Sequence, residues 1–225
     1  MIDFEALFRI TYGLFIVSSG DRNQGNGFIS NTVFQVTADP PQFVVCCNKD
    51  NFTAGIIEKF GVFSVSILEK ETPPEIMGHF GFKSGRDFDK MAGMSLKYGQ
   101  TDVPIVLNAA IAFLECRVVS KIDVGTHLLF IGELLQSVLL DNTKDPLTYL
   151  YYRQIKKGSA PKNAPTYIDK SRLEKQKAES TLKKYRCMAC GYIYDEENES
   201  VRFSDLPESW TCPVCGSEKS EFIEV

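Results

Sequence analysis

Apolar, β-branched and aromatic residues gather in short runs along roughly the first 150 positions, and runs of this kind predict strands. Gly, Pro, Asn and Asp stand between many of the runs, where turns reverse the chain. The strands expected from this pattern cover residues 11–18, 28–37, 42–47, 62–68, 109–122, 127–139 and 147–151. So many strands in a short stretch favour a closed barrel, because closure leaves no sheet edge exposed.

Three segments break this pattern and indicate helices. Residues 53–60 read Thr-Ala-Gly-Ile-Ile-Glu-Lys-Phe, and a second helix is expected within residues 74–94. Residues 169–184 are rich in Lys, Glu, Ala and Leu, which favours a short solvated helix with Asp169 as its N-cap. The fold is therefore expected to be mainly β with a few helices.

The composition is that of an ordinary globular protein. The chain has 225 residues, enough for one or two domains, with 44% hydrophobic and 24% charged side chains. No apolar run approaches the roughly 20 residues that span a bilayer. The first five residues, Met-Ile-Asp-Phe-Glu, are acidic where an export signal needs a basic start. We therefore expect no membrane partner and a cytoplasmic location.

Charge divides the sequence into three segments. Residues 1–152 hold 12 basic and 17 acidic side chains, residues 153–184 hold 10 and 3, and residues 185–225 hold 3 and 9. The formal net charge of -4 thus hides two acidic modules and a basic connector between them, whose first part carries one Gly and two Pro. The predicted domains are residues 1–152, a partly helical linker of residues 153–184, and residues 185–225. An acidic protein lacks the basic surface that holds nucleic acid, so no such partner is expected.

Four of the seven cysteines form two Cys-x-x-Cys pairs: Cys187, Cys190, Cys212 and Cys215. Two tight turns of this kind bring four thiolates into a tetrahedron, and the glycine after each pair lets the N–H groups of the turn point at the sulfurs. A module of about 41 residues has little core of its own, so the metal supplies much of its stability. The other cysteines lie in apolar segments and are expected to be buried, inert thiols: Cys46, Cys47 and Cys116.

Spacing alone does not choose the metal. Four thiolates in a tetrahedron suit zinc or iron, and a zinc ribbon is the plainer interpretation. Aromatic residues surround the two pairs in the sequence: Tyr185, Tyr192, Tyr194, Phe203, Trp210 and Phe222. Such a shell either lowers the local dielectric and tunes a redox potential, or serves as a simple aromatic core.

Residues 185–225 resemble a rubredoxin. The first half of the match reads Tyr-Arg-Cys-Met-Ala-Cys-Gly-Tyr-Ile-Tyr-Asp, and the second reads Phe-Ser-Asp-Leu-Pro-Glu-Ser-Trp-Thr-Cys-Pro-Val-Cys-Gly, followed by Lys219 and Phe222. The resemblance implies one iron held by the four cysteines, which cycles between the ferric and ferrous states. The 21 residues between the pairs are fewer than free-standing rubredoxins usually have, which bears on the potential or the partner surface rather than on the ligands.

The first module lacks two common nucleotide-binding motifs, a Gly-x-Gly-x-x-Gly after a strand and a P-loop. It offers instead the stretch Asn-Lys-Asp-Asn-Phe-Thr at residues 48–53, which leads from a strand into a predicted helix. Free N–H groups at a helix start attract anions such as phosphate. The alternative is a plain helix cap, since Asn and Thr often serve as caps.

Residues 8–152 resemble the flavin reductase-like, FMN-binding split barrels. The matching stretches are residues 26–41, 53, 57, 63–68, 80–81, 84–90, 125–127 and 132–133. The resemblance implies a split β-barrel with a bound FMN, reduction by NADH or NADPH, and a homodimer whose interface helps to frame the flavin.

The same resemblance assigns the flavin site. The residues that line the flavin are Asn26, Ser30, Asn31 and Thr32, and those that hold its phosphate are Asn48, Lys49 and Thr53. Lys90 is a second cation for the phosphate, or else a solvated charge. His127 lies near the flavin ring or the incoming nicotinamide, or else is an ordinary barrel histidine. Family members often have Asp where Thr126 precedes this histidine, which argues against a His–carboxylate pair and an acid–base role.

Together the two modules and the connector resemble the high-molecular-weight rubredoxins, which are NAD(P)H:rubredoxin oxidoreductases. The resemblance implies electron transfer from NAD(P)H through FMN to the iron, and on to a flavodiiron protein that removes O2 or NO. The cofactors carry this chemistry, so no protein nucleophile is expected, and the iron turns over twice for each hydride. Two alternatives stand beside this interpretation. One is a flavin reductase that releases reduced flavin and docks through its metal domain; the other is a catalytically silent barrel with a zinc ribbon.

Overall fold

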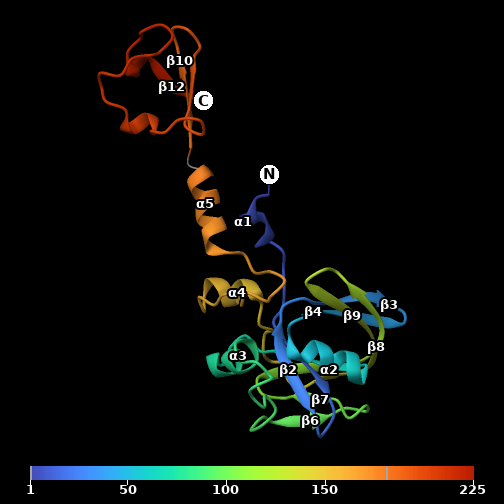
Figure 1. Cartoon of the computed structure of the whole chain (residues 1–225). Coiled ribbons are helices and arrows are strands. Elements are labelled where there is room, and N and C mark those ends of the chain that lie inside the picture. Colours follow the sequence, from blue (N-terminus) through green and yellow to red (C-terminus); the bar gives the residue numbers. More distant parts are fainter. Residues whose placement is uncertain (1, 181) are drawn as a thin grey trace. The chain divides into compact units, whose positions relative to one another are not determined.

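The computed structural model describes residues 2–180 and 182–225, which fold as two compact units (Figure 1). The first unit spans Glu5–Tyr167, and the second spans Ile168–Val225 with a few residues from the N-terminus. Among the described residues, no helix is both long enough and apolar enough to cross a membrane.

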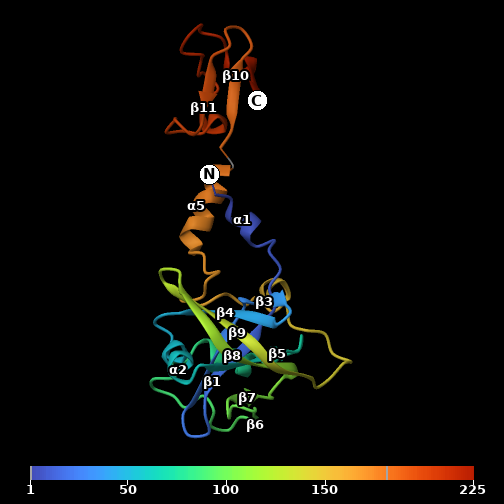
Figure 2. The ribbon, with the colours of Figure 1, turned by 90° about the vertical axis from the view of Figure 1, so that its right-hand side faces the viewer.

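The first unit is built on a seven-stranded antiparallel sheet of order β2–β1–β5–β8–β9–β4–β3. The strands are β1 (Phe15–Gly20), β2 (Gly25–Ser30), β3 (Val33–Ala38), β4 (Pro41–Asn48), β5 (Val62–Leu68), β8 (Ala110–Asp123) and β9 (His127–Leu139). The longest strands, β8 and β9, pair with each other in the middle of the sheet (Figure 2). The prediction of a mainly β first module is confirmed.

The two edges of this sheet come from one continuous stretch of chain. Strand β2 ends at Ser30 and β3 begins at Val33, so only Asn31 and Thr32 join the opposite edges, and the sheet has to curl. The N–H of Cys46 in β4 donates to the Thr32 carbonyl at 3.1 Å. The expected closed barrel is not formed in the described chain, because β2 pairs with β1 and β3 with β4, and no ladder joins β2 to β3.

Helix α2 (Phe52–Phe60) packs its apolar face on the sheet, as predicted for residues 53–60. Asn51 caps its start, because the side-chain oxygen accepts the Thr53 N–H at 3.0 Å. Gly61 ends the helix in the left-handed region, with φ of 67°. The buried Ala54 and Ile57 join the main core. That core also contains Val17, Val45, Phe63, Val65, Cys116 and Phe130.

One of the next two helices is predicted, and the other replaces a predicted strand. Helix α3 (Pro74–Gly81) falls within residues 74–94, where the sequence predicts a helix. The strand predicted at residues 147–151 is wrong beyond its start, because helix α4 (Tyr149–Gln154) begins there. The Thr148 hydroxyl accepts the Tyr151 N–H at 3.2 Å, and the buried Tyr149 anchors the helix in the core. A cap and a buried anchor thus override the strand preference of an aromatic-rich run.

A two-stranded ribbon packs on the sheet next to β5, and the hydrophobic pattern does not predict it. It consists of β6 (Leu96–Tyr98) and β7 (Pro104–Val106). The hydroxyls of Ser64 and Ser66 in β5 donate to the carbonyls of Pro104 and Val106, each at 2.6 Å. Both serines are fully buried, and a buried hydroxyl needs a hydrogen-bond partner. The backbone carbonyls of the ribbon supply one to each serine.

Glu115 in β8 is a fully buried carboxylate that anchors the loop between β6 and β7. It accepts the N–H groups of Gln100 at 2.9 Å and Thr101 at 2.8 Å. The Thr101 hydroxyl, at 2.7 Å, and the Gln136 side-chain amide also donate to it. Burial opposes its ionisation, but these hydrogen bonds outweigh burial and lower the pKa of Glu115.

The second unit contains a three-stranded sheet of order β11–β10–β12. Its elements are α5 (Lys170–Ser180), β10 (Lys184–Cys187), β11 (Ile193–Asp195), the 3-10 turns η1 (Phe203–Asp205) and η2 (Lys219–Glu221), and β12 (Phe222–Glu224). A short helix α1 (Phe4–Leu7) lies near the start of the chain. The helix expected at residues 169–184 is confirmed over α5, with the Asp169 carboxylate accepting the Ser171 N–H at 2.9 Å. Residue 181 lies outside the described residues.

We expect Glu115→Gln to lower the free energy of unfolding by about 2 kcal/mol, because the new amide nitrogen faces buried backbone donors. The native pKa of Glu115 is below its ordinary value, so the wild type holds this stability above about pH 4 and loses it as the pH falls through the native pKa. The variant should lose less stability on acidification. Urea denaturation at neutral and acidic pH measures both effects.

Glu133→Gln is the matched control, because Glu133 lies exposed on the adjacent strand β9. It should change the free energy of unfolding by less than about 0.5 kcal/mol. Equal losses in the two variants would contradict the anchoring role of Glu115.

Candidate metal centre and cofactor cavity

Two turns in the second unit carry the predicted metal ligands, and the turns are built alike. In the first turn the Gly191 N–H donates to the Cys187 carbonyl at 2.9 Å, and in the second the Gly216 N–H donates to the Cys212 carbonyl at 2.8 Å. Both glycines lie in the left-handed region, with φ of 80° and 74°. Each Cys-x-x-Cys-Gly sequence therefore folds into the same local structure, as its glycine predicts.

The four cysteine sulfurs converge into a cage. All four lie within 4.8 Å of one another. The Sγ atoms of Cys187 and Cys215 are 3.7 Å apart, as are those of Cys190 and Cys212. Metal–sulfur bonds of about 2.3 Å in a tetrahedron separate neighbouring sulfurs by about 3.8 Å. The cage therefore suits one tetrahedral metal ion.

The cage is open to solvent on one side. Cys187 and Cys212 are buried, whereas Cys190 and Cys215 are exposed. The hydroxyl and then the backbone N–H of Ser217 lower the pKa of the Cys215 thiol, which favours the ionised sulfur that binds a metal. The exposed sulfurs leave a short path between a bound metal and a docked protein.

The aromatic residues expected around the pairs pack into one cluster. Tyr185 stacks on Phe203, with ring centroids 4.2 Å apart. Trp210 meets Tyr194 at 5.6 Å and Phe222 at 5.3 Å, both edge to face. In a unit this small, the cluster provides the apolar core beside the metal cage.

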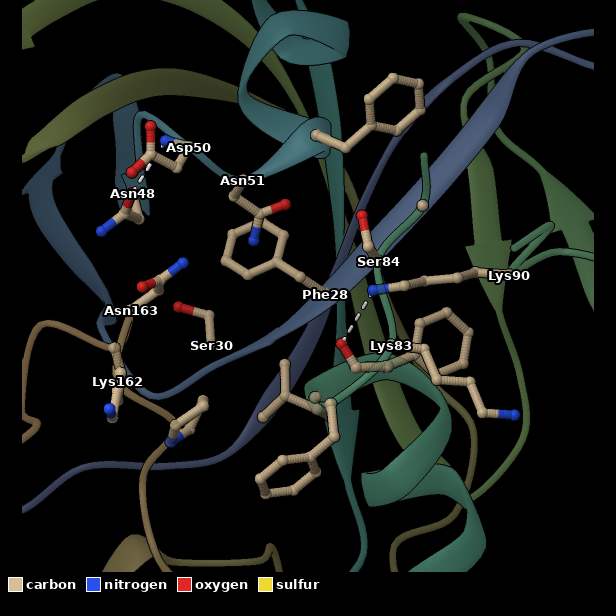
Figure 3. A pocket seen from close by; sticks show the side chains of 18 of the residues that line it. Phe28, Ser30, Asn48, Asp50, Asn51, Lys83, Ser84, Lys90, Lys162 and Asn163 are labelled. Atoms are coloured by element: carbon tan, nitrogen blue, oxygen red, sulfur yellow. Dashed lines mark hydrogen bonds between the residues drawn. The ribbon is translucent and has the colours of Figure 1, made fainter. Parts of the chain in front are cut away.

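The first unit contains a cavity of about 390 Å³ between the start of α2, the loop after α3 and the end of β2 (Figure 3). The residues that line it include Phe28, Ser30, Asn31, Cys46, Asn48, Asp50, Asn51, Phe52, Phe80, Lys83, Ser84, Arg86, Lys90, Lys162, Asn163 and Pro165. Aromatic rings share this lining with amides, hydroxyls and several cations. Such a mixture suits a flat ligand that carries negative charge.

The start of α2 and the loop after α3 place a helix N-terminus and a guanidinium at one end of the cavity. Asn51 lines the cavity at the helix N-terminus, where the helix dipole favours negative charge. The Arg86 guanidinium donates to the Asp50 carbonyl at 2.9 Å and so lies beside this helix start. Gly85 permits the close approach of the loop, since a Cβ there would lie 2.1 Å from the side chain of Asn26. A phosphate group would meet both a helix N-terminus and a guanidinium here.

Lys90 is a buried cation of the cavity, with 3% of its surface exposed, so it is not a solvated charge. Its Nζ donates to the carbonyl of Gly27 at 3.0 Å and to that of Phe80 at 3.1 Å, the bond drawn at Lys90 in Figure 3. Burial lowers the pKa of Lys90 to about 8. The amine is therefore mostly charged at pH 7 and keeps one of its three N–H donors for a ligand.

The cavity brings together three further residues predicted for the flavin site: Ser30, Asn31 and Asn48. Asn26, Thr32 and Thr53 do not line it. The Thr53 hydroxyl donates to the Asn26 side-chain oxygen at 3.0 Å, and the Thr32 hydroxyl donates to that of Asn31 at 3.1 Å. Within the described chain these three residues position the lining rather than form it.

Lys49 and His127 line a second hollow, of about 540 Å³, which shares part of its wall with the cavity. Lys49 forms an ion pair with Asp123 at 2.6 Å. The His127 Nδ1 lies 2.8 Å from the Thr126 hydroxyl, and Nε2 lies 3.2 Å from the Asn163 carbonyl. Because a carbonyl only accepts, Nε2 donates to Asn163. The partner of Nδ1 is the hydroxyl of Thr126 rather than a carboxylate.

Residues 161–166, the connector strap, run along the wall that the two hollows share. The Asn31 side-chain amide donates to the Thr166 hydroxyl at 2.7 Å, and the Asn163 carbonyl accepts from His127. Ala160, directly before the strap, packs against an apolar cluster of the first unit. The first part of the basic connector is therefore a structural part of the cavity.

The lining residues absent from the predicted site include three groups: Asn51 and Phe52, the loop with Ser84 and Arg86, and the connector strap. The first two had a signal in the sequence. Asn51 stands at a helix start, and Ser-Gly-Arg lies in a stretch that matches the FMN-binding split barrels. The strap had none, because its Gly and Pro residues are typical of a spacer.

The donors of the cavity fit a flavin mononucleotide. The helix start and Arg86 suit its phosphate, as argued above. Phe28 offers an apolar surface to a flat ring, and Ser30 and Lys90 offer hydrogen-bond donors to the polar ring edge. The chemistry of the lining therefore agrees with the cofactor that the sequence resemblance implies.

Comparisons with known proteins give each unit a family. The family model described as flavin reductase like domain matches residues 7–159, and the rubredoxin model matches residues 184–222. The high molecular weight rubredoxin of Moorella thermoacetica is 39% identical over 232 residues, which cover 100% of both chains. The ferric-chelate reductase (NAD(P)H) of Archaeoglobus fulgidus is 44% identical and covers 75% of this chain and 99% of its own.

Among solved structures, an NADH:FAD oxidoreductase of Streptomyces globisporus superposes with a TM-score of 0.58 at 22% identity, over 64% of this chain and 84% of its own. That likeness confirms the flavin reductase-like fold. The chain is an oxidoreductase that binds the flavin FMN in its first unit and one iron ion on the four cysteines of its second. It belongs to the high-molecular-weight rubredoxins, in which a flavin reductase-like domain is followed by a rubredoxin domain.

Proposed function

We propose that this protein passes electrons from NAD(P)H through FMN to one iron ion, and from the iron to an acceptor protein. The observation that carries the proposal is the tetrahedral four-sulfur cage on the same chain as a flavin reductase-like cavity. A bound flavin accepts a hydride and releases its electrons singly, whereas one iron ion takes one electron. A chain that holds both connects a two-electron donor to a one-electron acceptor.

In this proposal the phosphate of FMN lies at the start of α2, within reach of Arg86 and the Ser84 hydroxyl. Both residues line the cavity beside Asn51. Lys90 and Ser30 donate to the polar edge of the ring. The Lys90 donor is held in place before the cofactor binds, because the amine already donates to two backbone carbonyls.

The second hollow is the place we assign to the diphosphate of the nicotinamide nucleotide. Lys49 lies there beside His127, and the hollow shares residues 162–165 with the cavity. A nucleotide phosphate would compete with Asp123 for Lys49, which costs little because both partners of that ion pair are well exposed. The name of the Archaeoglobus relative, a reductase that uses NAD(P)H, supports the same donor.

The connector strap favours a retained FMN over the alternative of a reductase that releases its flavin. Thr166 ties the strap to Asn31 in the cavity wall, and Asn163 ties it to His127. A cofactor that has to leave past a hydrogen-bonded segment dissociates slowly. Retention is what internal electron transfer requires.

As acceptor we propose a flavodiiron protein that reduces O2 or NO, as the sequence resemblance implies. The exposed sulfurs of Cys190 and Cys215 support docking of a protein at the metal cage. Met188 and Val214, which stand inside the two pairs, are 58% and 65% exposed. Exposed apolar residues around a redox centre suit a transient protein contact.

We further propose a homodimer formed through the first unit. Its strands β3 and β8 carry exposed apolar side chains: Phe34, Val36, Val119 and Ile122. Burying such residues against a second copy would remove apolar surface from water.

The free cysteine thiols fit a reducing compartment, which supports a cytoplasmic location.

Anaerobic addition of NADH to the purified protein should bleach the flavin absorption and the ferric–thiolate absorption together. The physical reason is that electrons that enter at FMN have a ferric acceptor on the same chain. A double variant with Cys187→Ser and Cys212→Ser is the control, which should keep flavin reduction and lose the iron bands. Bleached flavin beside persistent ferric iron, or a colourless metal site, would rule the proposal out.

Thr166→Val should raise the dissociation constant of FMN by about fivefold to tenfold, because loss of the hydrogen bond to Asn31 frees the connector strap. Thr166→Ser keeps the hydroxyl and should bind FMN as the wild type does. Recovery of free-flavin fluorescence on dilution measures the constant. An unchanged constant in Thr166→Val would exclude the strap from flavin retention.

A further inference from the structure

The two cysteine turns match in their backbone and differ in one side chain. In the first turn the Cys187 N–H donates to the carbonyl of Tyr192, and in the second the Cys212 N–H donates to that of Ser217, both at 2.8 Å. Tyr192 and Ser217 therefore occupy equivalent positions. Only the serine brings a hydroxyl to a sulfur, with its Oγ 3.1 Å from the Sγ of Cys215.

We propose that the Ser217 hydroxyl is a positioning group that sets the reduction potential of the iron through a hydrogen bond to the Cys215 sulfur. The inference deepens the proposed function, on which it rests for the identity of the metal. A metal-bound thiolate carries no proton, so Ser217 is the donor and the sulfur is the acceptor. The two exposed cysteines of the cage therefore differ, because the turn of Cys215 supplies a hydroxyl donor and the turn of Cys190 does not.

The sign of the effect follows from charge. Reduction of the iron adds one negative charge to the cage, and the four thiolates share it. A hydrogen bond to an ionised acceptor strengthens as the acceptor becomes more negative, so the Ser217 hydroxyl stabilises the ferrous form more than the ferric form. The hydroxyl therefore raises the potential and makes the iron a better acceptor of electrons from the flavin.

The hydroxyl can be removed without disturbing the turn. The Ser217 carbonyl accepts the Cys212 N–H, and its own N–H donates to Cys215, so the backbone holds the loop in place. The side chain is partly buried, and the sulfur is its hydrogen-bond partner in the described chain. Alanine at this position would leave the backbone bonds and delete only the O–H donor.

The test is a redox titration of the full-length protein, reconstituted with iron and titrated with dithionite and mediators. Ser217→Ala should shift the ferric–ferrous equilibrium by about threefold to tenfold toward the ferric form, at most about 59 mV for one electron. Ser217→Thr keeps the hydroxyl and should stay close to the wild type. The ferric–thiolate charge-transfer bands should shift in Ser217→Ala for the same reason.

Tyr192→Phe is the matched control in the equivalent turn, because among the described residues no cysteine sulfur accepts a hydrogen bond from the Tyr192 hydroxyl. This variant should leave the reduction potential of the iron unchanged. The flavin potential should stay the same in every variant. An unshifted Ser217→Ala, or an equal shift in Tyr192→Phe, would overturn the assignment. Because dithionite rather than NADH supplies the electrons, failure of NADH to reduce the iron would count against the proposed function and leave this result readable.

Discussion

Two residues join the opposite edges of the seven-stranded sheet. Asn31 and Thr32 are the whole link between β2 at one edge and β3 at the other, so the sheet has to curl. The curl brings the Thr32 carbonyl to the Cys46 N–H in β4, and the cavity lies where these strand ends meet the start of α2. Asn31 also lines the cavity and holds the connector strap through Thr166. The curl, the cavity and its closure thus depend on one two-residue turn.

The metal centre could be predicted from the sequence because its information is local. Each turn needs two thiolates and a glycine with positive φ within five residues, and Cys187–Gly191 and its counterpart around Cys212 fold alike. The strands were predictable for a related reason, since β-branched and aromatic runs report a pleated, half-buried surface. The choice of iron over zinc came from the resemblance to rubredoxins, because sulfur geometry accepts either metal.

The cavity was predicted only in part, because it depends on contacts between residues far apart in the sequence. Thr53 and Lys49 stand beside the helix start, but Thr53 turns inward to Asn26 and Lys49 turns to Asp123, 74 residues away. The bond between Asn31 and Thr166 spans 135 residues. The local hydrophobic pattern does not indicate where the side chains of Thr53 and Lys49 point, or that Asn31 and Thr166 meet. The composition of the connector strap therefore indicated a spacer, whereas in the fold the strap forms part of the cavity wall.

A flavin and an iron on one chain should exchange electrons within one protein molecule or its dimer, without collisions between separate molecules. Stopped-flow mixing of the anaerobic protein with excess NADH measures this most directly, by following the ferric–thiolate absorption after the flavin is reduced. The rate constant of iron reduction is expected to stay the same when the protein is diluted about tenfold, because a tethered partner keeps its effective concentration. A rate constant that falls in proportion to the protein concentration would contradict internal transfer.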